Sequence, residues 1–242
     1  MSMITIIGRG HSGTRAISHT LYASGVFMGH TLNRSGDKVP AAAMYDAARV
    51  FSRHVSWKSG LEWDFDRVTG DSPMDAEYQR LVGEYMKDVD DDPASLKGWK
   101  LPETTLSLPW ITRLYPEAYY VYLVRDPRDS ILAAHNTDDL ARFDVPYPET
   151  EDVLERRAIS WKYQYDLVAA TPKPSHWITL RFEDFILHQE RELKRLEEFL
   201  NIPLGRIIVR PEAVGRWRRS AEKVPDFDFL QTALQESGYD QD

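Results

Sequence analysis

Three glycines (Gly8, Gly10 and Gly13) and the hydroxyl side chains of Ser12 and Thr14 share one short turn near the start of the chain. Such a turn points several backbone N–H groups at one place, and a helix that begins directly after it adds the positive end of its dipole. Negative charge is favoured at that place. The turn is therefore predicted to bind an anion, most often a phosphate.

The residues on either side of the turn predict the elements that hold it. Residues 4–7 form a short apolar run rich in β-branched isoleucine, which is typical of a buried parallel strand. After the turn, Ile17 and Leu21 fall on one helical face, and Gly25 is a helix stop signal. The pattern therefore predicts a strand, a glycine-rich turn and a helix.

Two well-known phosphate motifs nearly match this turn. Residues 8–13 fit G-x-G-x-x-G, the dinucleotide fingerprint, which also needs an acidic residue at the end of a second strand about 20 residues on. Asp37 has suitable spacing, but residues 33–36 before it are turn-like. The kinase-type P-loop fits except that Thr14 stands where its lysine should be. A kinase and an NAD-binding oxidoreductase remain as alternatives.

Composition bounds the class of protein. The chain has 242 residues, of which 42% are hydrophobic, so one α/β domain over residues 1–242 is expected. It contains no cysteine, which excludes disulfides and thiolate chemistry. The net charge of −8 disfavours a nucleic-acid partner. The first strand starts almost at once and no apolar run reaches about 18 residues, so a soluble, cytoplasmic protein without a membrane span is expected.

The rest of the chain alternates between helical and strand-like segments. Helices are predicted over residues 41–55, 72–89, 105–115, 127–135, 153–170 and 190–200. Strands are predicted over residues 96–100, 119–124 and 176–182. Residues 41–89 are expected to form a helical insert that caps a pocket, with an acidic turn at 88–93. The tail from residue 209 is expected to be irregular.

This alternation predicts a parallel β-sheet flanked by helices on both faces, as in P-loop-like folds. Ligands of such sheets bind at the carboxyl ends of the strands. Residues 8–15, 100–103 and 125–129 each follow a predicted strand. We therefore expect these three segments to meet at one edge of the sheet.

Four segments together resemble a known family. Ser12-Gly13-Thr14 after a strand resembles the 5′-phosphosulfate loop of the sulfotransferases that use 3′-phosphoadenosine 5′-phosphosulfate (PAPS). Residues 120–129 are similar to that family's 3′-phosphate strand, in which an arginine, here Arg125, holds the 3′-phosphate. Residues 177–185 with the helix after them, and Arg210 with residues 214–218, resemble the family's later segments.

The resemblance implies a sulfotransferase fold and PAPS as the donor, with no metal. It implies donor-binding residues at Arg9, Gly10, His11, Ser12, Gly13, Thr14, Arg15, Arg125, Ser130, Arg210, Arg216 and Trp217. The chain departs from the family pattern at several of these places. His11 replaces a basic residue, Arg15 replaces a second threonine, and Ala133 stands where a serine is expected, with Ser130 nearby but out of register. Pro211 and Glu212 replace Lys-Gly.

Sulfuryl transfer needs donors around the sulfuryl group, a cation on the bridging oxygen and a base for the acceptor. The family resemblance favours Lys100 as the cation, and His11 or Arg15 could share that role. Three residues remain candidates for the base: His30, Asp37 and Glu103.

The acceptor is expected to be a small molecule or a glycan. His54, Trp57 and Trp63 could line its pocket, although the tryptophans also suit simple packing within the insert. A non-catalytic nucleotide-binding module is the alternative from another class, because the loop lacks its usual lysine.

Overall fold

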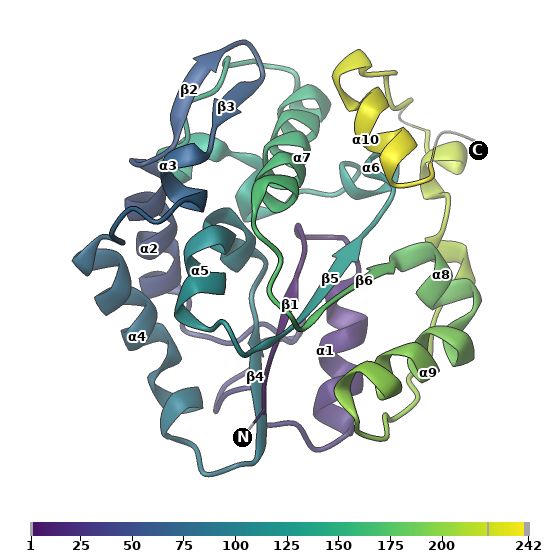
Figure 1. Cartoon of the computed structure of the whole chain (residues 1–242). Helices are drawn as coiled ribbons and strands as arrows, with labels where there is room; N and C mark the ends of the chain where they lie inside the picture. Colours follow the sequence, from purple (N-terminus) through teal and green to yellow (C-terminus); the bar gives the residue numbers. More distant parts are fainter. Residues whose placement is uncertain (1, 222, 240–242) are drawn as a thin grey trace.

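The centre of the molecule is a sheet of four parallel strands in the order β4-β1-β5-β6 (Figure 1). The structure is a computed structural model that describes residues 2–221 and 223–239. The strands are β1 (Ser2–Ile7), β4 (Leu96–Lys100), β5 (Tyr119–Val124) and β6 (Trp177–Arg181). Their register aligns Ile6 of β1 with Lys100 of β4 and Val121 of β5. The predicted parallel sheet is confirmed.

Helices cover both faces of the sheet (Figure 1). One face is covered by α1 (Thr14–Ala23), α8 (Phe182–Leu187) and α9 (Gln189–Leu200). The other is covered by α2 (Ala42–Ser52), α4 (Ala76–Asp91), α5 (Leu108–Leu114) and α7 (Val153–Ala170). Ile6 packs in the first layer and Ile7 in the second, and both are fully buried. A strand covered on both faces is apolar throughout rather than alternating, which is why β1 was recognisable.

The segment from Trp57 to Gly70, expected to be part of a helical insert, is mostly not helical. It forms an antiparallel hairpin of β2 (Ser56–Ser59) and β3 (Glu62–Asp64), followed by the short α3 (Asp66–Thr69). Trp57 is 42% exposed, whereas the indole of Trp63 donates to the carbonyl of Pro146 and packs against Tyr163. The expectation was wrong because Gly60, with φ of 50°, provides a turn that pairs the flanking residues.

Other helices also begin or end at residues different from those predicted. Helix α4 begins at Ala76, because the carboxylate of Asp75 accepts a hydrogen bond from the backbone N–H of Glu77 and caps it. It continues to Asp91, so the expected acidic turn is largely helix, and Asp88 pairs with Lys38 at 2.8 Å. The helix predicted to start at Thr105 is preceded by the 3-10 helix η1 (Pro102–Ser107).

The helix predicted through His135 ends early. Helix α6 spans only Pro127–Ser130, and the chain then turns through η2 (Asn136–Asp138) and η3 (Leu140–Phe143). The turn at η2 is stabilised by a reciprocal cap, in which His135 and Asp138 each accept a hydrogen bond from the other end of the turn. This early end brings His135 back toward the first loop.

The tail is more ordered than expected. It contains η4 (Pro211–Ala213), η5 (Arg216–Arg219), η6 (Asp228–Leu230) and α10 (Gln231–Glu236). Leu230, Ala233 and Leu234 are buried in a small cluster with Trp161 of α7, which explains why this part folds back onto the domain. Among all described residues, no helix combines the length and apolar character needed to cross a bilayer.

Candidate functional site

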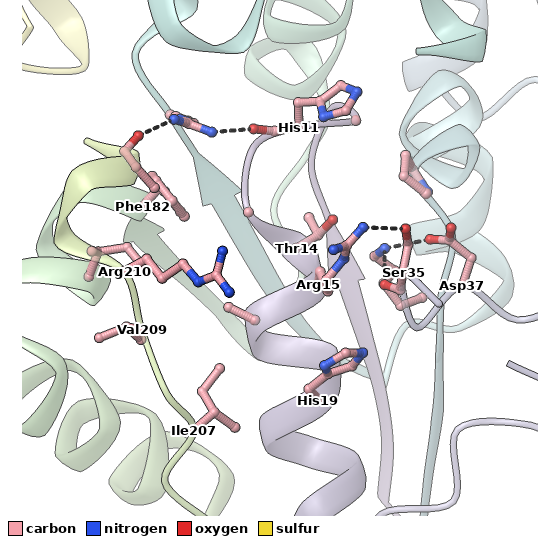
Figure 2. Close-up of a pocket in the computed structure, with 18 of the residues that line it drawn as sticks. His11, Thr14, Arg15, His19, Ser35, Asp37, Phe182, Ile207, Val209 and Arg210 are labelled. Carbon is pink, nitrogen blue, oxygen red and sulfur yellow. Dashed lines mark hydrogen bonds and ion pairs between the residues drawn. The ribbon is translucent and has the colours of Figure 1, made fainter. Parts of the chain in front are cut away.

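A cavity of about 400 Å³ opens at the carboxyl ends of the strands, between α1 and the C-terminal segment (Figure 2). Its walls come from the turn after β1, the end of β4, the end of β5 and residues 207–210. The three segments expected to meet at one sheet edge therefore do meet. The size is that of a small-molecule site.

The glycine-rich turn forms one end of this cavity, to which Gly10, His11, Gly13, Thr14 and Arg15 contribute. Gly13 is the N-cap of α1 and has φ of 89°, a backbone conformation that residues other than glycine rarely adopt. A β-carbon there would lie 2.1 Å from the ring of Phe182. Because Gly13 has no side chain, it cannot accept hydrogen bonds from the first backbone N–H groups of α1. These N–H groups therefore remain available to an anion.

Arg9 and Ser12 belong to the turn but face away from the cavity. The buried guanidinium of Arg9 donates to the carbonyls of Gly10 and Ser130, each at 3.0 Å, and pairs with Asp138. Ser12 is also buried and faces a different, small cavity. The Ser130 hydroxyl is buried without a hydrogen-bond partner among the described residues. The structure thus gives Arg9 a role in holding the turn against α6 rather than a position at the ligand.

Three arginines also line the cavity. Arg125 from the end of β5 and Arg210 and Arg216 from the tail all border it. Arg125 donates to the carbonyl of His11 at 2.9 Å and to the carbonyl of Ala213, 88 residues later, at 2.6 Å. Figure 2 shows Arg210 reaching into the space beside Phe182. Two cationic segments that are far apart in sequence therefore converge here.

Trp217 does not line the cavity. Its backbone N–H donates to Asp129 at 2.8 Å, and its ring stacks against the guanidinium of Arg128 at 4.1 Å from the ring centre. Asp129 also binds Arg125 at 3.0 Å and the backbone N–H of Gly215. Asp129 therefore ties the tail to the end of β5, and Trp217 is part of that attachment.

Lys100 and Asp37 form a buried ion pair in the cavity wall. The Lys100 ammonium, which is 2% exposed, also donates to the carbonyl of Ser35 at 2.9 Å. The second carboxylate oxygen of Asp37 accepts from the side-chain amide of Asn33 at 2.8 Å. Burial lowers the pKa of Lys100, and the adjacent Asp37 opposes that shift. Arg15 lies beside them and donates to the Ser35 hydroxyl at 2.8 Å (Figure 2).

The other two candidate bases lie elsewhere. Glu103 is 1% exposed and lies behind the cavity wall, where burial raises the pKa of its carboxyl to about 7. His30 is exposed, with its ring against Phe27 and its backbone N–H donating to Asp88 at 3.0 Å. It borders a different cavity, beside Lys38. Of the three candidates, only Asp37 lines the cavity that holds the glycine-rich turn.

Sequence reasoning missed several lining residues. They are His135 and the apolar side chains of Phe182, Ile186, Ile207 and Val209. His135 was hidden inside a segment predicted as helix, and no local pattern marks it. Phe182 lies within a segment that resembled the sulfotransferases, so that resemblance was the one signal that could have found it. His54, Trp57 and Trp63 do not line the cavity.

The dinucleotide alternative fails on geometry. It requires Asp37 to end a second strand, but residues 24–41 form a loop with only isolated bridges. Within the described part of the chain, no group of three or more histidine, aspartate or glutamate side chains is arranged to hold a metal ion.

Comparison with known proteins identifies the family. The sulfotransferase domain from the curacin biosynthetic pathway has the same fold, with a TM-score of 0.62 at 14% identity over 99% of this chain and 98% of that one. The sulfotransferase domain of the Synechococcus PCC 7002 olefin synthase gives a TM-score of 0.50 at 12% identity, over 98% and 94%.

Among curated proteins, protein-tyrosine sulfotransferase 1 of Danio rerio is 29% identical over 124 residues, which are 50% of this chain and 33% of that protein. The chain thus matches about a third of that relative's length. The sequence pattern of the sulfotransferase family matches residues 4–206. Because that match covers most of the 242 residues, the chain belongs to the sulfotransferase family.

Proposed function

We propose that this chain moves the sulfuryl group of 3′-phosphoadenosine 5′-phosphosulfate to a hydroxyl or amine of a small-molecule or glycan acceptor. When bound, the donor supplies a sulfuryl group, whose bond to the acceptor forms as the bridging S–O bond breaks and adenosine 3′,5′-bisphosphate leaves. The observation that carries the proposal is the joint lining of one cavity by residues from distant segments. The glycine-rich turn, Arg125 and Arg210 all border this cavity, together with apolar side chains such as Phe182.

The residues present fit such a donor. The N-cap Gly13 has no side chain that could bind the first N–H groups of α1, so these can donate to an anion, and the arginine forks suit a ribose 3′-phosphate. Phe182 lines the cavity and would offer the adenine of the donor an apolar contact. ATP and NAD have no 3′-phosphate on the adenosine ribose, so they would leave Arg125 and Arg210 without a phosphate to bind.

Lys100 and Asp37 are the residues best suited to the chemistry. The ammonium of Lys100 brings a positive charge to the cavity wall next to the turn, where it would stabilise negative charge on a departing phosphate. The Asp37 carboxylate faces the same space and would accept the proton of the attacking hydroxyl or amine.

Nucleotide binding followed by product analysis tests the proposal. Adenosine 3′,5′-bisphosphate should raise the melting temperature more than AMP, ATP or NAD at equal concentration. The donor is then incubated with a sugar alcohol, a phenol such as a tyrosine peptide, and an amine, and sulfated product is sought by mass spectrometry. Equal stabilisation by adenosine 3′,5′-bisphosphate and AMP would overturn the proposal. Tight binding without any transfer or donor hydrolysis would favour the non-catalytic module.

A further inference from the structure

We propose that His135 donates a hydrogen bond from its Nε2 to a peripheral oxygen of the sulfuryl group, as a neutral imidazole. This inference rests on the proposed function, since it concerns the same donor. It would make His135 a catalytic residue contributed by the segment after α6, which lines the same cavity as Lys100 and Asp37. The inference has three supports: the orientation of the ring, its position against the turn and its surroundings.

The orientation of the His135 ring is held by the turn that follows it. The backbone N–H of Thr137 donates to Nδ1 at 3.2 Å, and the Thr137 hydroxyl lies 3.0 Å from the same nitrogen. The backbone N–H of His135 donates to Asp138 at 2.7 Å, and Asp138 is paired with the buried Arg9. A nitrogen that accepts a hydrogen bond carries no proton in the neutral ring, so the proton lies on Nε2.

The ring lies directly against the glycine-rich turn. A β-carbon on Gly10 would come within 2.1 Å of the imidazole of His135, so only glycine at that position allows the ring to approach so closely. His135 lines the cavity together with Gly13, Thr14 and Lys100. The imidazole therefore borders the place where the turn is expected to hold the phosphosulfate.

The histidine within the turn itself is not free for this role. The Nε2 of His11 lies 2.7 Å from the carbonyl of Ala134, and its ring meets His135 edge-on at 5.8 Å between centres. Figure 2 shows the His11 ring turned away from Phe182 and Arg210. The Nε2 of His135, by contrast, has no hydrogen-bond partner among the described residues, so of the two rings only His135 has an uncommitted donor.

The surroundings keep the ring neutral. It faces the cations Arg9 and Lys100 and the imidazole of His11, while Asp37 and Asp138 are its acidic neighbours. Burial, followed by the charges of Arg9 and His11, lowers the pKa of His135 to about 3. A neutral N–H donor adds no further charge to a pocket that already holds several cations, and it does not change its protonation state at physiological pH.

Two amide substitutions distinguish the capping role of the His135 Nδ1 from the proposed hydrogen-bond donation by its Nε2. His135→Asn places an amide near the Nδ1 position and can still cap the turn, but it has nothing at Nε2. His135→Gln places an amide near the Nε2 position. We expect His135→Asn to lower kcat by about 10²–10³, the usual loss for one transition-state donor. It should leave the affinity for adenosine 3′,5′-bisphosphate, which lacks the sulfuryl group, within about twofold. His135→Gln should recover part of the kcat that His135→Asn loses.

A control and a second readout complete the test. His188→Asn replaces an exposed histidine outside the cavity and should leave kcat and both affinities unchanged. Imidazole ¹⁵N spectra of the folded wild type should show His135 protonated on Nε2 alone from pH 5 to 8. Addition of the donor without acceptor should shift that signal more than adenosine 3′,5′-bisphosphate does.

The outcomes distinguish this inference from the proposed function. Titration of His135 between pH 5 and 8, or an Nδ1-protonated ring, would overturn the inference whatever the activity. So would a wild type that transfers sulfate while His135→Asn keeps its full kcat. A wild type that prefers neither adenosine 3′,5′-bisphosphate nor the donor over AMP would instead overturn the proposed function.

Discussion

The Lys100 ammonium is bonded to the Asp37 carboxylate across 63 residues of sequence, joining the end of β4 to the loop after α1. Both groups are nearly buried and both border the cavity. A buried ion pair is costly to desolvate and weak as a source of stability, so its position at a cavity wall favours a chemical role.

Replacement of either partner should therefore impair turnover more than binding. Lys100→Ala is expected to lower kcat by about 10²–10³, and Asp37→Asn by about 10²–10⁴. The affinity for adenosine 3′,5′-bisphosphate, measured by calorimetry, should change little in either variant. The double variant should lose much less than the product of the two single losses, because the groups act together. A raised Kd with an unchanged kcat would mean that Lys100 only binds.

The turn at Gly13 should not tolerate a side chain. Gly13→Val places a β-carbon against Phe182 at a backbone conformation that costs about 1–3 kcal/mol for other residues. Nucleotide binding should be lost. Gly83→Val is the matched control, because Gly83 lies in α4 with open space around it. Thermal unfolding of both variants shows whether each is folded, and undiminished affinity in folded Gly13→Val would remove the turn from the site.

Arg125 and Arg210 should recognise the additional phosphate of adenosine 3′,5′-bisphosphate. Each charged hydrogen bond contributes roughly 1.5–3 kcal/mol, so adenosine 3′,5′-bisphosphate should bind on the order of hundreds-fold tighter than AMP. In Arg125→Ala/Arg210→Ala that preference should nearly vanish.

Arg210→Ala alone is the cleaner variant, because Arg125 also holds the backbone of His11 and Ala213. Arg80→Ala removes an equal charge from the surface of α4 and should leave the preference intact. A preference that survives in Arg210→Ala and in the double variant would assign the phosphate to other residues.

Glu103 should make the folded state less stable as the pH rises. Its folded pKa of about 7 exceeds the value of 4.5 for an ordinary glutamate, so the folded protein holds a proton that the unfolded chain releases between those values. The free energy of unfolding then falls across that window, by on the order of 3 kcal/mol. Glu103→Gln should be more stable than the wild type at pH 8 and equal to it near pH 4.5. Urea unfolding at the two pH values measures this, and a pH-independent difference would contradict it.

The sequence alone determined the parts of the fold that depend on local patterns. The isoleucines of residues 4–7 and the run from Tyr119 to Val124 marked the buried strands, because a strand covered on both faces must be apolar throughout. The glycines of the first turn marked a turn that lines the cavity, because glycine alone allows the positive φ at Gly13 without strain. The arginines at 125 and 210 were identified through motif resemblance, and both line the cavity.

Tertiary structure alone decided which polar side chains enter the cavity. The Arg9 side chain lies away from the cavity because its guanidinium pairs with Asp138, 129 residues later. His30 lies outside the cavity, where its backbone N–H donates to Asp88. Asp37 and Glu103 are both acidic residues near Lys100 in space, yet only Asp37 reaches the cavity while Glu103 is packed behind it. His135 entered because α6 ends at Ser130 and the next turn folds back. Each of these outcomes depends on contacts between segments distant in sequence, which spacing along the chain does not record.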